Sequence, residues 1–213
     1  MNRSDAETLW EVARVLARDA AKVSRARAPR ALPPLLFFTD PIRTPRPWET
    51  AARLPAGAAV VFRHFGQADA LGAALRLRDV TARAGVRLLI GLDADLAEAV
   101  GADGLHLPER ALDQAGPLSE AHPEWLITGA AHAGSPLDSA HLHARILSPL
   151  FAAGGASSAR APLDLTVFRT LAASAACPVY ALGGIDAKNA QSLIGSGAGG
   201  LAGVSAIQAA FGA

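Results

Sequence analysis

Two segments near the C-terminus combine the residue types that bind phosphate. The apolar run at residues 178–182 leads into Gly183-Gly184, and the run at 199–203 leads into Val204-Ser205 at the start of a helical pattern. Glycine lets the backbone approach an anion closely, and the first N–H groups of a helix carry partial positive charge. The residues expected to bind phosphate are therefore Gly183, Gly184, Val204 and Ser205. The alternative is that the glycines only make a tight turn between a strand and a helix.

His132 is the candidate for acid-base chemistry. It directly follows an apolar run at residues 126–131, so it should lie where a buried strand ends. An imidazole titrates near neutral pH, and one side chain can therefore remove a proton from one atom and deliver it to another. The alternative is a histidine that is hydrogen-bonded within a loop.

The composition indicates one soluble domain. The chain has 213 residues, of which 51% are hydrophobic and 18% charged, and its net charge of +1 offers no field for nucleic acid or an acidic membrane. Cys177 is a lone cysteine, which suits a reducing compartment. No apolar run reaches membrane-spanning length, and none has the features of a leader sequence. We expect a cytoplasmic protein that binds neither nucleic acid nor membrane.

Short apolar runs alternate with stretches of helical period along most of the chain. The runs are near-continuous, as strands buried on both faces should be. They occupy residues 35–39, 58–64, 87–92, 104–107, 126–131, 144–149, 179–182 and 200–204, and helical stretches include 68–84, 94–100, 163–175 and 187–196. This alternation predicts an α/β fold, a (β/α)₈ TIM barrel, with a doubly wound open sheet as the alternative. In a barrel, the strand ends that carry the glycine segments lie on the face where chemistry occurs.

An additional helix is expected before the barrel. Ser4 and Glu7 have the spacing of a capping box, and apolar residues then recur at helical spacing until Pro33-Pro34 breaks the chain. We expect residues 1–34 to form an N-terminal helix and linker, and residues 35–213 to form the barrel. The helix would pack against the barrel or contribute to a homodimer contact.

Six short motifs follow one another along the segment expected to form the barrel. They are Leu-Phe-Phe-Thr-Asp at 36–40, Ala-Asp-Gly-Leu-His-Leu at 102–107, Ile-Thr-Gly-Ala-Ala-His at 127–132, Ser-Pro-Leu-Phe at 148–151, residues 178–185 with Asn189, and Val-Ser-Ala-Ile at 204–207. In these motifs and their order, the chain resembles the thiamine-phosphate synthase/TenI family over about residues 35 to 211. The motif at 102–107 is the most specific.

The resemblance implies a barrel that binds a small phosphorylated thiazole. Family synthases join this compound to a pyrimidine diphosphate with the help of Mg²⁺, whereas TenI-like relatives tautomerise a thiazole carboxylate phosphate without metal. His132 matches the histidine that TenI-like enzymes use for proton transfer. On the same grounds, the residues expected to contact the substrate are Arg63, His106 and Ser148.

The sequence departs from the synthase pattern at the positions that bind metal and diphosphate. Of the family motif Gln-Leu-Arg-Glu-Lys, only Arg63 survives, in a segment that reads Val-Phe-Arg-His-Phe. Leu92 and Ala111 occupy the positions of the Mg²⁺-binding carboxylates. Because Mg²⁺ needs oxygen ligands, we expect no metal or other cofactor, and we disfavour Asp93 or Glu109 as substitute ligands.

The sequence therefore favours a divergent, TenI-like member of the family that acts as a metal-independent thiazole tautomerase. The alternatives are a divergent thiamine-phosphate synthase, also called a thiamine-phosphate pyrophosphorylase, and a non-catalytic barrel that binds a phosphorylated ligand for regulation. The fold does not choose among them, because one barrel hosts many reactions.

Overall fold

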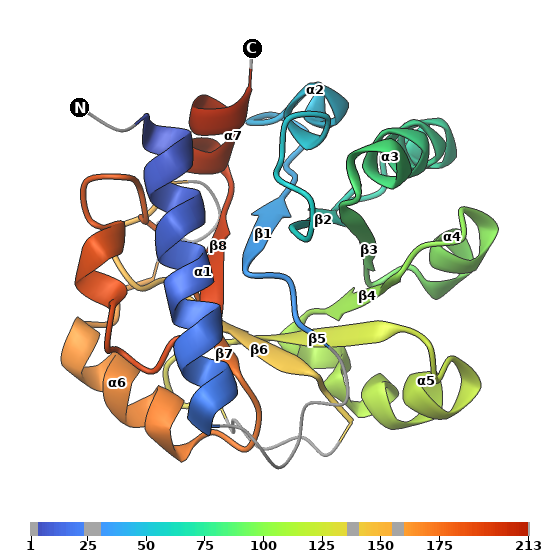
Figure 1. The fold of residues 1–213 in the computed structure, drawn as a ribbon. Coiled ribbons are helices and arrows are strands. Elements are labelled where there is room, and N and C mark those ends of the chain that lie inside the picture. Colours follow the sequence, from blue (N-terminus) through green and yellow to red (C-terminus); the bar gives the residue numbers. More distant parts are fainter. Residues whose placement is uncertain (1–3, 24–30, 136–140, 155–159, 213) are drawn as a thin grey trace.

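The strands form a closed barrel in the computed structural model, which describes residues 4–23, 31–135, 141–154 and 160–212 (Figure 1). Within these residues, eight parallel strands follow one another around the barrel in chain order. They are β1 (Leu35–Phe38), β2 (Ala59–Phe62), β3 (Arg87–Gly91), β4 (Gly104–Leu107), β5 (Leu126–Ala131), β6 (Ala144–Leu147), β7 (Val179–Leu182) and β8 (Gly200–Gly203). This arrangement confirms the predicted (β/α)₈ barrel, and every predicted strand is present.

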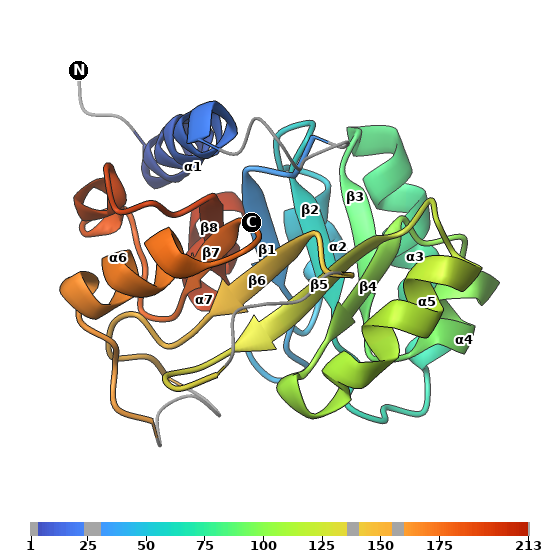
Figure 2. The same cartoon turned by 90° about the horizontal axis from the view of Figure 1, so that it is seen from below.

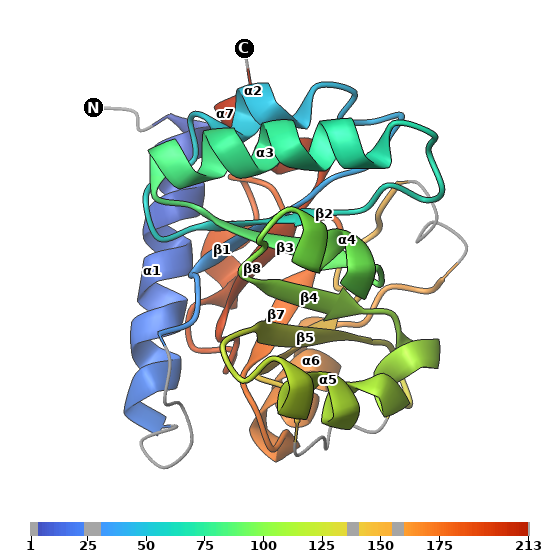
Figure 3. The same ribbon diagram turned by 90° about the vertical axis from the view of Figure 1, so that its right-hand side faces the viewer.

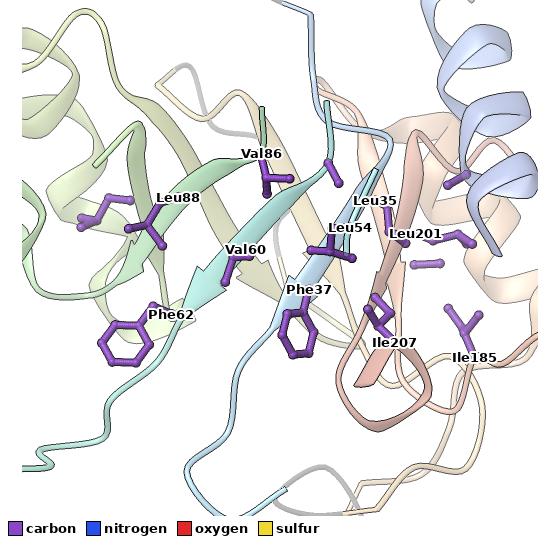
Figure 4. Packing of buried hydrophobic residues seen from close by; sticks show 14 of the residues in the cluster. Leu35, Phe37, Leu54, Val60, Phe62, Val86, Leu88, Ile185, Leu201 and Ile207 are labelled. Atoms are coloured by element: carbon purple, nitrogen blue, oxygen red, sulfur yellow. The ribbon is translucent and has the colours of Figure 1, made fainter. Parts of the chain in front are cut away.

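Alternate residues of the strands face the inside and the outside of the barrel. One buried cluster is built from strand residues and contains Leu36 and Phe38 of β1, so it fills the interior. A second cluster contains Leu35 and Phe37, which point outward. Figure 4 shows these outward residues packed with Leu54 and Ile207, which lie outside the strands. Since both faces of each strand are buried, the strands read as continuous apolar runs in the sequence.

Helices of unequal length cover the barrel. They are α2 (Pro47–Ala51), α3 (Ala70–Ala84), α4 (Ala94–Ala99), α5 (Ala115–Ala121), α6 (Leu165–Ser174) and α7 (Ser205–Phe211), with the 3₁₀ segments η1 (Glu109–Gln114) and η3 (Ala190–Leu193). The helix expected at residues 187–196 is wrong, because the structure has only η3 there. The Asp186 side chain accepts the N–H groups of Lys188 and Asn189, and such local bonds compete with a regular helix.

The N-terminal helix α1 (Asp5–Val23) packs against the outer side of the barrel. It contacts β8, η3 and α7, and it lies outside the ring of strands in Figures 2 and 3. The capping box is confirmed, since Ser4 N–H donates to Glu7 Oε2 (2.9 Å) and Glu7 N–H donates to Ser4 Oγ (3.2 Å). The helix therefore covers the flank where η3 replaces a full helix. Residues 24–30 of the expected linker lie outside the described residues.

None of the helices within residues 4–23, 31–135, 141–154 and 160–212 is both long enough and apolar enough to cross a membrane.

Candidate active site

A cavity of about 720 Å³ opens where the strands of the barrel end. Its wall is formed by residues at, or directly after, the C-terminal ends of strands β1 to β7, so the cavity lies at the C-terminal edge of the sheet. The four side chains predicted for catalysis or substrate contact all border it: Arg63, His106, His132 and Ser148. The fold therefore brings these residues together from four different strands.

Arg63 is a largely buried cation in the wall of this cavity. Its Nε donates to the carbonyl oxygen of Thr39 (2.8 Å), and the rings of Phe38 and Phe65 each lie 5.3 Å from the guanidinium carbon. Burial lowers the pKa of Arg63 to about 10, although the charge of Asp40 opposes this shift. No hydrogen-bond partner is found for the buried Nη2 atom among the described residues. A buried cation attracts an anionic ligand strongly, because the interior screens its charge less than water does.

His106 lies deeper, among residues that keep it neutral. Burial, with a contribution from the charge of Arg63, lowers the pKa of His106 to about 3. Its Nδ1 is 3.0 Å from Thr128 Oγ1, and its ring meets that of Phe38 edge-on at 4.9 Å. At neutral pH this imidazole forms hydrogen bonds and does not carry a charge, so it lines the site as a neutral polar group.

His132 follows β5 and contacts two polar side chains. Its Nδ1 is 2.6 Å from Glu109 Oε2, and its backbone N–H donates to Ser135 Oγ (2.8 Å). Ser135 Oγ in turn donates to Glu109 Oε1. The hydrogen bonds from Ser135 and His132 lower the pKa of Glu109, so the carboxylate is ionised at neutral pH.

His132 and Ser148 also border a second cavity, of about 540 Å³. Glu109, Ser135 and Arg160 line this second cavity, whereas they are absent from the wall of the first. His132 therefore borders both cavities, whereas Glu109 borders only the second. Glu109 and His132 are 23 positions apart in the chain, and no sequence pattern indicates their contact. Their meeting depends on the adjacency of β4 and β5, which the barrel topology implies.

The predicted phosphate residues lie at neighbouring strand ends. Because Leu182 of β7 pairs with Ala202 of β8, Gly183-Gly184 and Val204-Ser205 follow adjacent strands. Gly183 and Gly184 have φ values of +104° and +64°, which side chains rarely adopt. A Cβ on Gly184 would also collide with the carbonyl oxygen of Ala152. The glycines are thus required by the turn itself, and phosphate binding there stays a prediction.

The residues at the expected metal positions do not fit Mg²⁺. Leu92 points an apolar side chain at the cavity, and Ala111 is buried in η1. Asp93 Oδ1 accepts the N–H of Leu96 at the start of α4 (2.9 Å), and its Oδ2 is 3.2 Å from His64 Nε2. The two oxygens of Glu109 accept hydrogen bonds from His132 and Ser135. Metal independence stays a prediction about the reaction.

The chain is similar in sequence to proteins named thiamine-phosphate synthase. The sequence profile of the family described as thiamine monophosphate synthase matches residues 39–207. A thiamine-phosphate synthase of Chloroflexus aurantiacus is 34% identical over 164 residues, which cover 75% of this chain and 76% of that protein. One of Methanoculleus marisnigri is 34% identical over 147 residues, which cover 65% of this chain and 67% of that protein.

A solved structure shares the fold. The thiamine phosphate pyrophosphorylase from Pyrococcus furiosus matches with a TM-score of 0.64 at 22% sequence identity, over 83% of this chain and 91% of that chain. The segment matched by the family profile includes Arg63, His106, His132 and Ser148.

Proposed function

Because the chain belongs to the thiamine monophosphate synthase family, we propose that its barrel binds a small phosphorylated thiazole and that His132 transfers a proton on this ligand. The phosphate would lie between Gly183-Gly184 and Val204-Ser205, held by backbone N–H groups. The reaction is the tautomerisation of a thiazole carboxylate phosphate, in which one proton leaves one atom of the ligand and another is delivered elsewhere.

The observation that carries this proposal is the placement of His132. The imidazole borders the 720 Å³ cavity while its Nδ1 is bound by an ionised carboxylate, which leaves Nε2 as the nitrogen for proton transfer. Arg63 and Ser148 on the same wall would bind and orient the ligand. These groups move a proton and hold an anion without help from a metal ion.

A second candidate activity is the formation of thiamine phosphate from the thiazole phosphate and a pyrimidine diphosphate. The names of the relatives support this activity more directly than they support tautomerisation. The buried charge of Arg63 would also suit a diphosphate. Against it stand Leu92 and Ala111 at the metal positions, together with the engaged oxygens of Asp93.

A product assay separates these activities. Purified protein is incubated with thiazole carboxylate phosphate, with and without the pyrimidine diphosphate and Mg²⁺, and the products are separated by chromatography. We expect the tautomer to form at the same rate after treatment with a chelator. Metal-dependent thiamine phosphate without tautomer would establish the second activity and refute the first, and neither product would indicate a barrel that binds its ligand without chemistry.

A further inference from the structure

Glu109, Ser135 and His132 form a connected group that joins the ends of β4 and β5. Glu109 follows Pro108 directly after β4, and its two oxygens accept hydrogen bonds from Ser135 Oγ and from His132 Nδ1. Ser135 also accepts the backbone N–H of His132, and its own N–H donates to the His132 carbonyl oxygen (3.1 Å). Both the backbone and the ring of His132 are therefore fixed.

We propose that Glu109, supported by Ser135, is a positioning residue that holds a proton on Nδ1 of His132, so that the neutral form of the ring is the tautomer with its lone pair on Nε2. An ionised carboxylate can only accept hydrogen bonds, so the ring nitrogen that faces it must carry a proton. Glu109 is ionised because the hydrogen bonds from Ser135 and His132 lower its pKa. The ring edge that carries Nε2 is thereby left for the ligand. The catalytic meaning of this tautomer rests on the proposed function, whereas the tautomer itself does not.

The geometry argues against three other roles for these residues. Ser135 is not the nucleophile of a serine-histidine pair, because its Oγ is bonded to Glu109 and not to the imidazole. Glu109 is not a free metal ligand, since both of its oxygens are engaged. The pair also contributes little to stability as an ion pair, because the side chains of His132 and Glu109 are 24% and 41% exposed. Orientation of the imidazole is the role that the contacts support.

The tautomer can be measured on the protein alone. Long-range ¹H–¹⁵N correlation spectra report which ring nitrogen of a neutral histidine carries the proton, and the His132 signals are assigned by their absence from a His132→Asn variant. We expect the Nδ1–H form in the native protein and a mixture, or the Nε2–H form, in Glu109→Ala. Glu98→Gln is the matched control, because Glu98 contacts a different histidine, His122, at 3.1 Å, and it should leave the His132 signals unchanged.

The result that overturns the proposal is an Nε2–H tautomer in the native protein, or an Nδ1–H tautomer that persists in Glu109→Ala.

A kinetic experiment uses the isosteric Glu109→Gln variant and thiazole carboxylate phosphate, and we expect kcat to fall about 10- to 100-fold with KM nearly unchanged. An unchanged kcat also contradicts the positioning role. If the tautomer behaves as expected but the native protein converts no thiazole, the proposed function fails and the assignment of the tautomer stands.

Discussion

Single residues in the cavity wall show how burial sets the chemistry that each side chain can perform. His106 and Arg63 are both removed from water, and burial disfavours the charged form of both. For His106 the result is a neutral imidazole, whereas Arg63 keeps its charge at neutral pH because its pKa falls only to about 10. The two residues therefore supply different groups to one site, a neutral hydrogen-bonding group and a cation.

The neutral state of His106 makes stability depend on pH. The unfolded chain takes up a proton on this histidine below about pH 6.5, whereas the folded protein resists protonation until about pH 3. The unfolded state thus binds more protons in this window, and stability falls as the pH falls by about 1.4 kcal/mol per pH unit. We expect His106→Gln, which keeps a hydrogen-bonding group for Thr128, to lack this contribution in urea unfolding experiments. The exposed His141→Gln control should follow the native protein, and an identical pH dependence for His106→Gln would refute the assignment.

The charge of Arg63 can be tested by binding of inorganic pyrophosphate. Arg63→Met keeps an unbranched side chain but removes the cation, and we expect calorimetry to show affinity reduced by about tenfold or more. Thermal stability should be retained or increased, since a charge that burial disfavours is removed. Arg63→Lys should retain only part of the affinity, because an ammonium group lacks the planar guanidinium that lies near the rings of Phe38 and Phe65. Unchanged pyrophosphate affinity in Arg63→Met would exclude Arg63 as the anion site.

The sequence predicted which side chains border the cavity better than it predicted their contacts with one another. The family resemblance predicts Arg63, His106 and Ser148 at the substrate, and the apolar run before His132 predicts its place at a strand end. All four side chains border the cavity, because the ends of parallel strands meet at one edge. The contact between Glu109 and His132 could not be predicted, because it depends on side-chain directions in two loops. The neutral state of His106 also needed the structure, since it arises from burial of the ring and from the nearby charge of Arg63.

Among the elements, the segment after β7 shows why a helical pattern did not produce a helix. Asn189 Oδ1 accepts the N–H of Asp186 (3.0 Å), and its Nδ2 donates to the carbonyl oxygen of Gly184 (2.8 Å). These bonds hold the chain in turns, so that the predicted helix is reduced to the 3₁₀ segment η3. The strands were predicted more reliably, because burial on both faces leaves a continuous apolar signal.

The same bonds should shape the turn that is proposed to bind phosphate. Asn189→Ala removes both of them, and we expect the affinity for inorganic phosphate to fall about tenfold as the Gly183-Gly184 turn loosens. Ser4→Ala is the control, because loss of the α1 capping box should cost about 1 kcal/mol of stability without changing the phosphate affinity. Equal phosphate affinity in Asn189→Ala and the native protein would contradict this role.

At the scale of the whole molecule, α1 belongs to the cooperative structure of the barrel. Leu9, Val12 and Leu16 are almost fully buried, and they share one apolar cluster with outward-facing residues of the strands. The helix was predicted from its capping box and apolar spacing. Its position across β8, η3 and α7 could not be predicted, because it follows from the absence of a full helix between β7 and β8.

Removal of buried contacts of α1 should therefore destabilise the entire protein. We expect Leu16→Ala to lower the free energy of unfolding by about 2–5 kcal/mol, whereas the exposed Arg14→Ala should change it by less than about 0.5 kcal/mol. Urea transitions followed by tryptophan fluorescence and by circular dichroism should coincide in both variants. A separate early transition of Leu16→Ala would show that α1 unfolds independently of the barrel.

Transfer of solvent hydrogen tests the central claim, that His132 moves a proton on a phosphorylated thiazole without metal. Chelator-treated protein is incubated with thiazole carboxylate phosphate in deuterated water, and NMR follows deuterium entering the thiazole product. We expect the native protein to incorporate one solvent deuteron per turnover and His132→Asn, although folded, to incorporate deuterium no faster than a protein-free sample. Equal rates for the native protein and His132→Asn, or incorporation that requires added Mg²⁺, would contradict it.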